Sequence, residues 1–343
     1  MSVYICKTYF DCVERATDHV ARFPINLDDP VIVFCEDKLT LEVERALAKK
    51  RGGNFNAEVL SLGRYASKRL KGGKTLSKEG MAMAVKKILT DVAPELTALK
   101  KTAGSPSLAS ETSELIAQLK SAKIDPDELL TATENLGGRS AAKIRDIATV
   151  FSRYEKFLSE SGLTDSNNAL SRISEAVKDD ETLGNTAVVF IGFSSITRQS
   201  AEAIDAISKA AKTTDYFAVK GENEDLFVNE FYSFVKKYDR SPTVCQSSVT
   251  DEAAKLLDGL FNPTVFSKNG KFTPKVYLYE AKDTADEAEF VARRIRRSVI
   301  EKGVRYRDVA IGVTDYDAYS IVLKRKLADY DIPYYSDEKT ILS

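Results

Sequence analysis

The sequence predicts an α/β protein whose parallel sheet is interrupted by an all-helical domain and followed by the start of a second α/β lobe. Two continuous apolar runs, VIVFC at 31–35 and AVVFI at 187–191, are typical of strands buried on both faces. Helical spacing follows each run, which favours parallel strands joined by crossover helices. Between residues 77 and 177 no run indicates a strand, and helical periodicity recurs instead.

The first 75 residues alternate strand and helix signals. The pattern predicts strands at 3–6, 31–35 and 58–60, and helices at 11–23, at 39–50 and from Ser61 to about residue 70. The neighbouring Gly72 and Gly73 end this alternation. We assign residues 1–75, together with 185–220, to one α/β core.

The rest of the chain divides by the same signals. Residues 76–184 are predicted as the inserted helical domain, with helix starts at Ser77 and at Asp125 before a proline. The sheet resumes with a strand at 187–191, a helix at 197–211 and a strand at 215–219. Residues 221–274 are assigned to an irregular or helical connector.

The last segment, residues 275–343, predicts the beginning of a second α/β lobe. We expect strands at 275–279 and 309–313, helices at 285–302 and 316–330, and a final extended piece at 332–335. No clear closing element follows, which indicates a cut made inside a larger protein.

Composition bounds the kind of protein. The 343 residues suggest two or three packing units, and 50 Lys+Arg against 51 Asp+Glu give a net charge of -1, so any nucleic-acid contact must come from a local patch. No run of about 18 apolar residues predicts a membrane span, and the start has no signal-peptide core. The cysteines Cys6, Cys12, Cys35 and Cys245 contain no CxxC pair, and His19 is the single histidine. We expect a cytoplasmic protein without a metal site or His-based catalysis.

The turn after the first strand is where a parallel-sheet nucleotide-binding protein holds phosphates. A phosphate loop needs glycines there, followed by Lys and Ser or Thr. This chain has Lys7 and Thr8, but residues 6–12 contain no glycine. A second requirement is an acidic residue at the end of a buried strand to hold magnesium. The strand at 187–191 ends instead in Ile191, followed by Gly192. The sequence therefore predicts a degenerate nucleotide site.

Several segments resemble the AddB-type subunits of bacterial helicase–nucleases. VFIGF at 189–193, with Thr197 after it, is similar to a family strand that ends in Asp-Gly-Phe before Phe-Thr, with Ile191 in place of the Asp. The segment at 33–40, with Glu44, resembles the family's strand, Pro-x-Gln and the helix with its Glu. The segment at 59–64 is similar to the strand and Ser-Phe-x-Arg that follow. KIRDIATVFSRY at 143–154, with Asp165, resembles a family helix and the Asp that follows it.

The end of the chain is similar to the opening of the second motor-like domain of UvrD-like superfamily 1 helicases. The matching positions are 286–289, Ile295, Gly303, 306–310, Tyr319 and 332–335. In many relatives an Arg that meets the outer phosphate follows the strand in this region. Thr314 stands in that place here.

The resemblance implies a P-loop-helicase-like fold in the N-terminal region of a subunit that acts on DNA double-strand breaks. It implies an AddA-type, UvrD-like helicase–nuclease subunit as the partner. ATP, magnesium and a C-terminal iron–sulfur cluster are the cofactors of the family. Neither the nuclease carboxylates nor the cluster cysteines are visible here, so we expect no cofactor and no catalysis in this fragment, within a whole protein that belongs to an ATP-dependent exodeoxyribonuclease.

Basic residues predict where DNA is contacted. Lys38 and Thr40 occupy the loop-to-helix position where related helicases hold a single strand. A second patch contains Arg64, Lys68, Arg69, Lys71 and Lys74, with Tyr65 beside them for base stacking. We assign single-stranded DNA binding to Lys38, Thr40, Arg64 and Lys68. The densest cluster, Arg293, Arg294, Arg296 and Arg297, favours a solvated face over phosphate contact because acidic residues share its helix.

These observations predict an inactivated helicase-like scaffold that binds DNA and a motor subunit. Two other functions stay open. One is an ATPase with an unconventional phosphate loop around Lys7 and Thr8. The other is an interaction module that docks through the helices of residues 77–177 and does not contact DNA.

Overall fold

The computed structural model describes residues 1–69, 74–165, 170–173, 176–177, 180, 182–220, 229–248 and 277–336. The chain forms two compact units, Met1–Phe272 and Thr273–Ser343.

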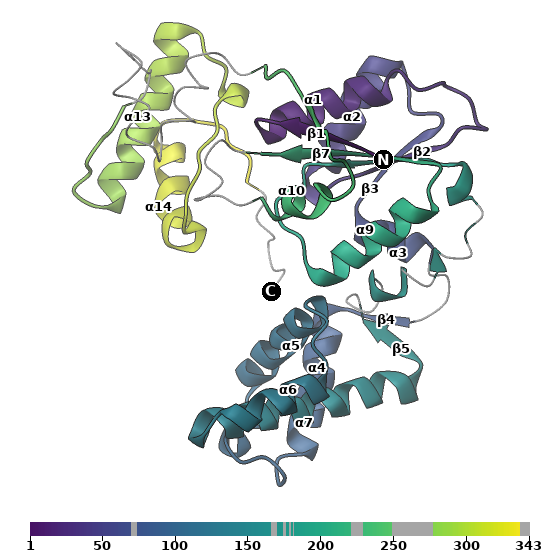
Figure 1. The fold of residues 1–343 in the computed structure, drawn as a ribbon. Coiled ribbons are helices and arrows are strands. Elements are labelled where there is room, and N and C mark those ends of the chain that lie inside the picture. Colours follow the sequence, from purple (N-terminus) through teal and green to yellow (C-terminus); the bar gives the residue numbers. More distant parts are fainter. Residues whose placement is uncertain are drawn as a thin grey trace. The chain divides into compact units, whose positions relative to one another are not determined.

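A parallel sheet organises the first unit (Figure 1). Its strands, in spatial order, are β3 (Ala57–Leu60), β2 (Val31–Phe34), β6 (Ala187–Ile191), β7 (Thr213–Val219), β1 (Ser2–Cys6) and β8 (Thr243–Val244). Every neighbouring pair in this sheet is parallel. The predicted parallel strands are confirmed, and the segment predicted as a connector adds the edge strand β8.

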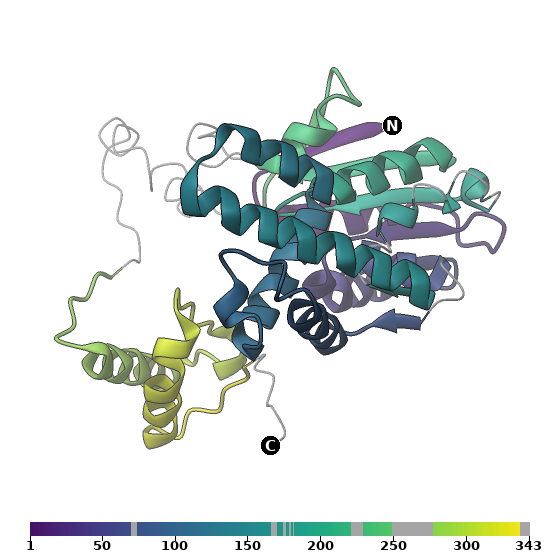
Figure 2. The same ribbon diagram turned by 90° about the horizontal axis from the view of Figure 1, so that it is seen from below.

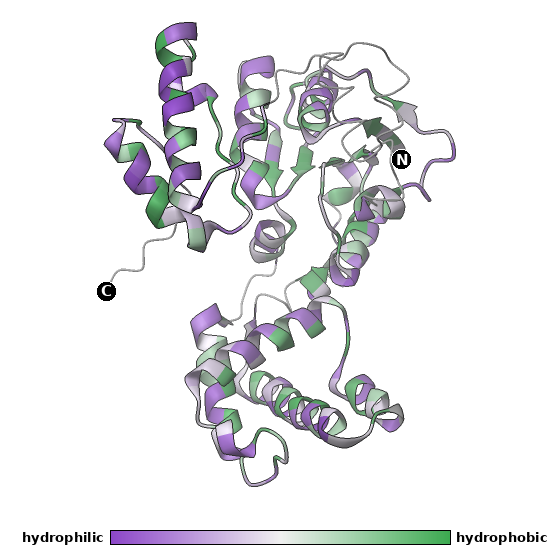
Figure 3. Cartoon of the chain, turned by 90° about the vertical axis from the view of Figure 1, so that its left-hand side faces the viewer, coloured by the Kyte–Doolittle hydropathy of each residue, from purple (hydrophilic) through white to green (hydrophobic). Residues whose placement is uncertain are grey.

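Helices cover both faces of the sheet. On one face lie α1 (Tyr9–Val20) and α2 (Thr40–Arg51), and on the other lie α3 (Leu62–Arg69), α9 (Arg198–Ala210) and α10 (Glu230–Val235). Successive strand residues alternate between the two cores, because side chains of a strand point to opposite faces. Val189 and Ile191 join the α1–α2 core, whereas Val188 and Phe190 join the other. Figure 3 colours the chain by hydropathy, and β2 and β6 consist of apolar residues alone.

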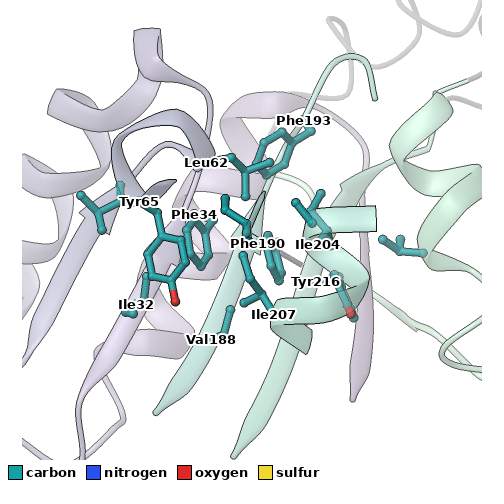
Figure 4. Close-up of a cluster of buried hydrophobic side chains, with 14 of the residues drawn as sticks. Ile32, Phe34, Leu62, Tyr65, Val188, Phe190, Phe193, Ile204, Ile207 and Tyr216 are labelled. Carbon is teal, nitrogen blue, oxygen red and sulfur yellow. The ribbon is translucent and has the colours of Figure 1, made fainter. Parts of the chain in front are cut away.

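Aromatic rings fill much of the core beneath α3 and α9 (Figure 4). The ring of Phe190 stacks on those of Phe34 and Tyr216, with centroids 5.1 and 5.4 Å apart. Tyr65 meets Phe34 edge to face and is 1% exposed. Such rings bury large apolar areas and favour these offset geometries, so they fix how the helices sit on the sheet.

Four α-helices lie between β4 (Lys74–Leu76) and β5 (Leu163–Asp165), and Figure 2 shows them from below. They are α4 (Lys78–Asp91), α5 (Pro106–Ser121), α6 (Pro126–Ala132) and α7 (Gly138–Ser161), around a core of their own. One expectation was wrong, because β5 pairs in parallel with β4. A three-residue strand is too short to show alternation, and its partner lies almost ninety positions away.

A buried ionic network includes side chains of α5, α7 and β5. Lys120 of α5, 9% exposed, places its Nζ 2.8 Å from Oδ2 of the fully buried Asp165 and 2.5 Å from Oε1 of Glu155. The hydroxyl of Tyr154 donates to the same Asp165 oxygen at 3.1 Å. The network therefore joins two helices to β5.

The second unit contains α13 (Thr284–Lys302) and α14 (Tyr316–Asp329), packed around Ala292, Ile295, Leu327 and Ile332. Both predicted helices are confirmed. The strand predicted at 309–313 is wrong. The strand predicted at 275–279 is also wrong over residues 277–279, the part that the structure describes. A strand needs a hydrogen-bonded neighbour. These apolar runs find none within residues 277–336, and Leu278 and Ile311 stay exposed.

Lys120→Met tests the buried network. The change leaves the Asp165 carboxylate buried without its cation, and we expect the helical domain to lose about 3–5 kcal/mol of stability. Hydrogen exchange of the α5 and α7 amides measures this loss. The control Lys78→Met breaks an exposed pair with Glu114 at 2.7 Å and should cost less than about 1 kcal/mol. Equal losses in the two variants would contradict a structural role for the network.

Candidate functional site

The carboxyl ends of the parallel strands define the candidate site. Ligands of open α/β sheets bind in the crevice outside these ends, where neighbouring connections leave toward opposite faces. Here β1 and β2 lead to α1 and α2 on one face, whereas β6 and β7 lead to α9 and α10 on the other. Lys7, Thr8, Ile191 and Gly192, predicted to form a degenerate nucleotide site, all lie at this edge.

The turn after β1 is organised by the Asp11 carboxylate. Thr8 is the N-cap of α1, and its hydroxyl accepts from the Asp11 backbone N–H while the Asp11 carboxylate accepts from the backbone N–H of Thr8 at 3.2 Å. This reciprocal box satisfies donors that the first turn leaves unpaired. The Thr8 hydroxyl and N–H are therefore engaged within the chain.

The same carboxylate also holds the segment after β8. Its two oxygens accept from the hydroxyls of Ser247 and Ser248 at 2.8 and 2.9 Å, and from the Ser248 backbone N–H at 2.9 Å. Burial alone would raise the pKa of Asp11, but these donors and Thr8 hold the pKa below its usual value. Asp11, which the sequence analysis did not single out, joins the turn after β1 to the segment that follows the edge strand.

The end of β6 is filled by side chains of α1. Ile191 is fully buried in the α1–α2 core, at the position where a magnesium-binding acid would stand. Gly192 has a φ of +55°, and its N–H donates to the Phe217 carbonyl at 2.8 Å. A Cβ at Gly192 would lie 3.3 Å from the Tyr9 ring and 3.5 Å from Cβ of Cys12. The ring and the thiol side chain thus occupy the space directly above this turn.

A second carboxylate links the ends of β2 and β6. The Ser194 backbone N–H donates to Oε1 of Glu36 at 2.6 Å, and Lys38 lies 2.7 Å from the other oxygen. Burial opposes ionisation, but Lys38 and Ser194 together hold the pKa of Glu36 below its usual value. Nearby, Asn229 donates to the Tyr9 hydroxyl at 3.3 Å. The edge is therefore closed by contacts among β2, β6, α1 and α10.

The cations predicted to contact DNA are exposed, but each has an acidic partner. Lys38 pairs with Glu36, Arg64 with Asp37 at 3.3 Å, and Lys68 with Glu58 at 2.6 Å. Their side chains are 70, 61 and 58% exposed. Thr40 is buried, and its hydroxyl donates to the Asp37 carbonyl at 2.9 Å. The structure places Lys38, Thr40 and Arg64 around the Glu36–Asp37 turn, on a locally neutral surface.

The expected stacking aromatic requires a correction. Tyr65 lies in the core against Phe34, since its position on α3 faces the sheet, so its ring is inaccessible to a base. Arg69, from the same predicted patch, pairs with Asp180 at 3.2 Å. Lys71 lies outside the described residues. The exposed aromatics at the carboxyl edge are instead Tyr9 and Phe10, which are 40 and 61% exposed.

The described residues contain neither a metal-binding cluster nor a membrane-spanning helix. Among them no group of three or more His, Cys, Asp or Glu side chains could hold a metal ion. Within the same residues no helix is long and apolar enough to cross a membrane.

Comparison with known proteins agrees with the motifs at this edge. The family model described as AddB, N-terminal, matches residues 11–243, which include β2, β6, β7 and all but the first two residues of α1. The chain belongs to the AddB N-terminal family. The family resemblance seen in the sequence is therefore confirmed.

The curated relatives are ATP-dependent helicase/deoxyribonuclease subunits B. The one from Pelotomaculum thermopropionicum is 27% identical and aligns with 96% of this chain and 31% of its own length. Those from Alkaliphilus metalliredigens and Listeria innocua are 25 and 24% identical, and each aligns with 91% of this chain and 29% of its own length. The AddB-family chain therefore spans less than a third of the relatives that it matches.

Thr314, predicted to belong to the degenerate nucleotide site, lies in the second unit. It is exposed and precedes Asp315, the N-cap of α14 in the second unit. The candidate site of this AddB-family chain is accordingly built from the first unit alone.

Gly192→Ala tests how closely the site is filled. A methyl group there meets Tyr9 and Cys12 on a backbone with positive φ, so we expect a loss of about 1–3 kcal/mol in stability. Urea unfolding monitored by circular dichroism measures the change. Gly63→Ala is the control, because its added methyl group would meet nothing within 4 Å in α3, and it should be neutral or slightly stabilising. A neutral Gly192→Ala would mean that the turn is open.

Proposed function

We propose that this chain is an inactivated helicase-like scaffold in a helicase–nuclease complex that processes DNA double-strand breaks. The observation that carries the proposal is the closure of the carboxyl edge by the chain's own side chains. Membership of the AddB N-terminal family supports the assignment to such a complex. The names of the relatives, helicase/deoxyribonuclease subunits B, support a second subunit as the motor.

The residues at the edge do not fit ATP with magnesium. Phosphates are bound by free backbone N–H groups in a glycine-rich turn. Here the Thr8 and Gly192 N–H groups donate to Asp11 and Phe217, and the Tyr9 ring covers Gly192. Ile191 offers no oxygen ligand for magnesium. Because these N–H groups are engaged within the chain and Ile191 supplies no carboxylate, the edge supports a scaffold rather than the unconventional ATPase.

The proposal places single-stranded DNA along the edge marked by Tyr9, Phe10, Lys38 and Arg64. Exposed rings stack on bases without regard to sequence, and cations beside them contact phosphates. Tyr9 and Phe10 supply rings, while Lys38 and Arg64 supply cations that are more than half exposed. Exposed ion pairs are worth about 0–1 kcal/mol, so these cations can exchange a carboxylate for a phosphate at small cost.

The helical domain is the proposed contact for the motor subunit. Large apolar side chains are exposed on it at Met83 of α4, Leu130 of α6 and Leu136. A partner that covers them would remove apolar surface from water, which favours association. The interaction module that does not contact DNA relies on this same surface, so the DNA experiment below separates the two functions.

Calorimetry with ATP and magnesium tests the inactive nucleotide site. We expect no heat of binding from the wild-type chain or from Lys7→Ala, because one lysine without a nest of amides holds phosphate only weakly. Micromolar affinity that disappears in Lys7→Ala would overturn the proposal and favour the unconventional ATPase.

DNA contact is tested by reversing three charges together, with Lys38→Glu, Arg64→Glu and Lys68→Glu in one variant. We expect the wild type to bind a single-stranded oligonucleotide weakly and with steep salt dependence, and the variant to lose binding, because phosphate contacts release counterions. Fluorescence anisotropy at several salt concentrations measures both.

The matched control reverses Lys78, Lys156 and Lys209, which are also exposed and paired with acids. It should bind as the wild type does. If both triple variants lost affinity equally, net charge rather than this surface would govern binding, and a wild type that bound no DNA would favour the interaction module.

A further inference from the structure

A cleft on the second unit gathers three arginines that the proposed DNA edge does not include. It has a volume of about 260 Å³ and is lined by Arg293, Arg296, Arg297, Ile300 and Glu301 of α13 and by Tyr330. The arginines stand three and four positions apart, so their side chains project from one face of the helix. We call this feature the arginine cleft.

The arginine cleft has an excess of positive charge. Arg297 pairs with Glu301 at 2.8 Å, whereas Arg293 and Arg296 form no ion pair within 4 Å among residues 277–336. Glu289, one turn before Arg293, is held by Lys326 at 2.7 Å and by the Tyr330 hydroxyl. Its charge is therefore largely compensated by a lysine from α14.

This arrangement differs from the cations of the first unit. Lys38, Arg64 and Lys68 each face their own carboxylate. Like charges spaced three and four residues apart on a helix repel each other and destabilise it. A cluster that retains this repulsion in the isolated chain is the better place for an anion, because a bound anion removes the repulsion.

Part of the cleft is held in position before any ligand binds. Arg296 is half-buried and donates from Nη1 to the Tyr306 hydroxyl at 2.5 Å. Tyr330 is fixed from the other side by its hydrogen bond to Glu289. Arg293 and Arg297 are exposed and can turn their planar donors toward a ligand. Guanidinium groups match phosphate oxygens in paired hydrogen bonds better than lysine does.

The size of the cleft indicates how much of a ligand it can take. Pockets for whole small ligands have volumes of about 300–1,000 Å³. At about 260 Å³, the arginine cleft lies just below this range, and its three guanidinium groups supply donors that suit phosphate oxygens. We propose that the arginine cleft binds a backbone phosphate of a DNA strand, an inference that rests on the DNA-binding function proposed above.

The test uses the whole chain, a fluorescent single-stranded thymidine 20-mer and the double variant Arg293→Gln/Arg297→Gln. Single-strand binding changes with salt by a slope of about 0.7 per phosphate contact. Loss of this one phosphate contact should therefore lower the slope by about 0.7 and weaken binding about tenfold. The variant Arg293→Lys/Arg297→Lys keeps the charge without the paired donors. We expect its affinity to lie between those of the wild type and the Gln variant.

Arg305→Gln/Arg325→Gln is the matched control, since it removes the same charge from the same unit and neither residue lines the cleft. An equal loss in this control would overturn the inference. So would displacement of the DNA by polyglutamate of equal charge as readily as by unlabelled oligonucleotide, because the surface would then select negative charge alone.

The outcomes also separate this inference from the function on which it rests. If the Lys38, Arg64 and Lys68 reversal abolishes binding while the arginine double variant behaves as its control does, the DNA function stands and the arginine cleft has no part in it. If the wild type binds no DNA, both proposals fail.

Discussion

The backbone ladder that joins β2, β6, β7 and β1 lies between two helix layers, and the arrangement of the first unit follows from this burial. Strands buried on both faces cannot leave donors or acceptors unpaired, so they pair in parallel and the chain returns through helices on each face. Alternate side chains of each strand enter separate cores, such as Val189 with α1 and Phe190 with α9. The connections then converge at the carboxyl ends, where β1, β2, β6 and β7 supply their turns.

In a nucleotide-binding protein of this architecture, phosphates and magnesium occupy that convergence. Here two carboxylates organise it. Asp11 accepts hydrogen bonds from Thr8, after β1, and from Ser247 and Ser248, after β8. Glu36 joins the turns after β2 and β6. Both carboxylates are ionised acceptors of several hydrogen bonds, an arrangement that stabilises their charged forms. These two carboxylates therefore join the turns that surround the phosphates in a nucleotide-binding protein.

The cations at the carboxyl edge and those of the arginine cleft differ in their electrostatic surroundings. The first-unit cations belong to exposed pairs, and their attraction for a polyanion is largely offset by Glu36, Asp37 and Glu58. On α13 the charges are concentrated instead, and the nearby Glu289 is bound to Lys326. The whole-chain charge of -1 conceals this difference, because the field near a surface depends on which charges are adjacent.

The sequence by itself determined the strands of the first sheet other than β8, and the alternation of strands with helices that predicts parallel pairing. It also determined that residues 6–12 contain no glycine and that Ile191 stands at the end of its strand. Long apolar runs and residue identities are local properties, so they can be interpreted without a partner. The tertiary structure decided the pairing of β5 with β4, the burial of Tyr65 and the exposure of Tyr9 and Phe10. It also left the apolar run at 309–313 unpaired among the described residues. Each of these depends on which distant segment lies alongside, because strands form only on a neighbouring ladder and a ring is buried only where another element covers it.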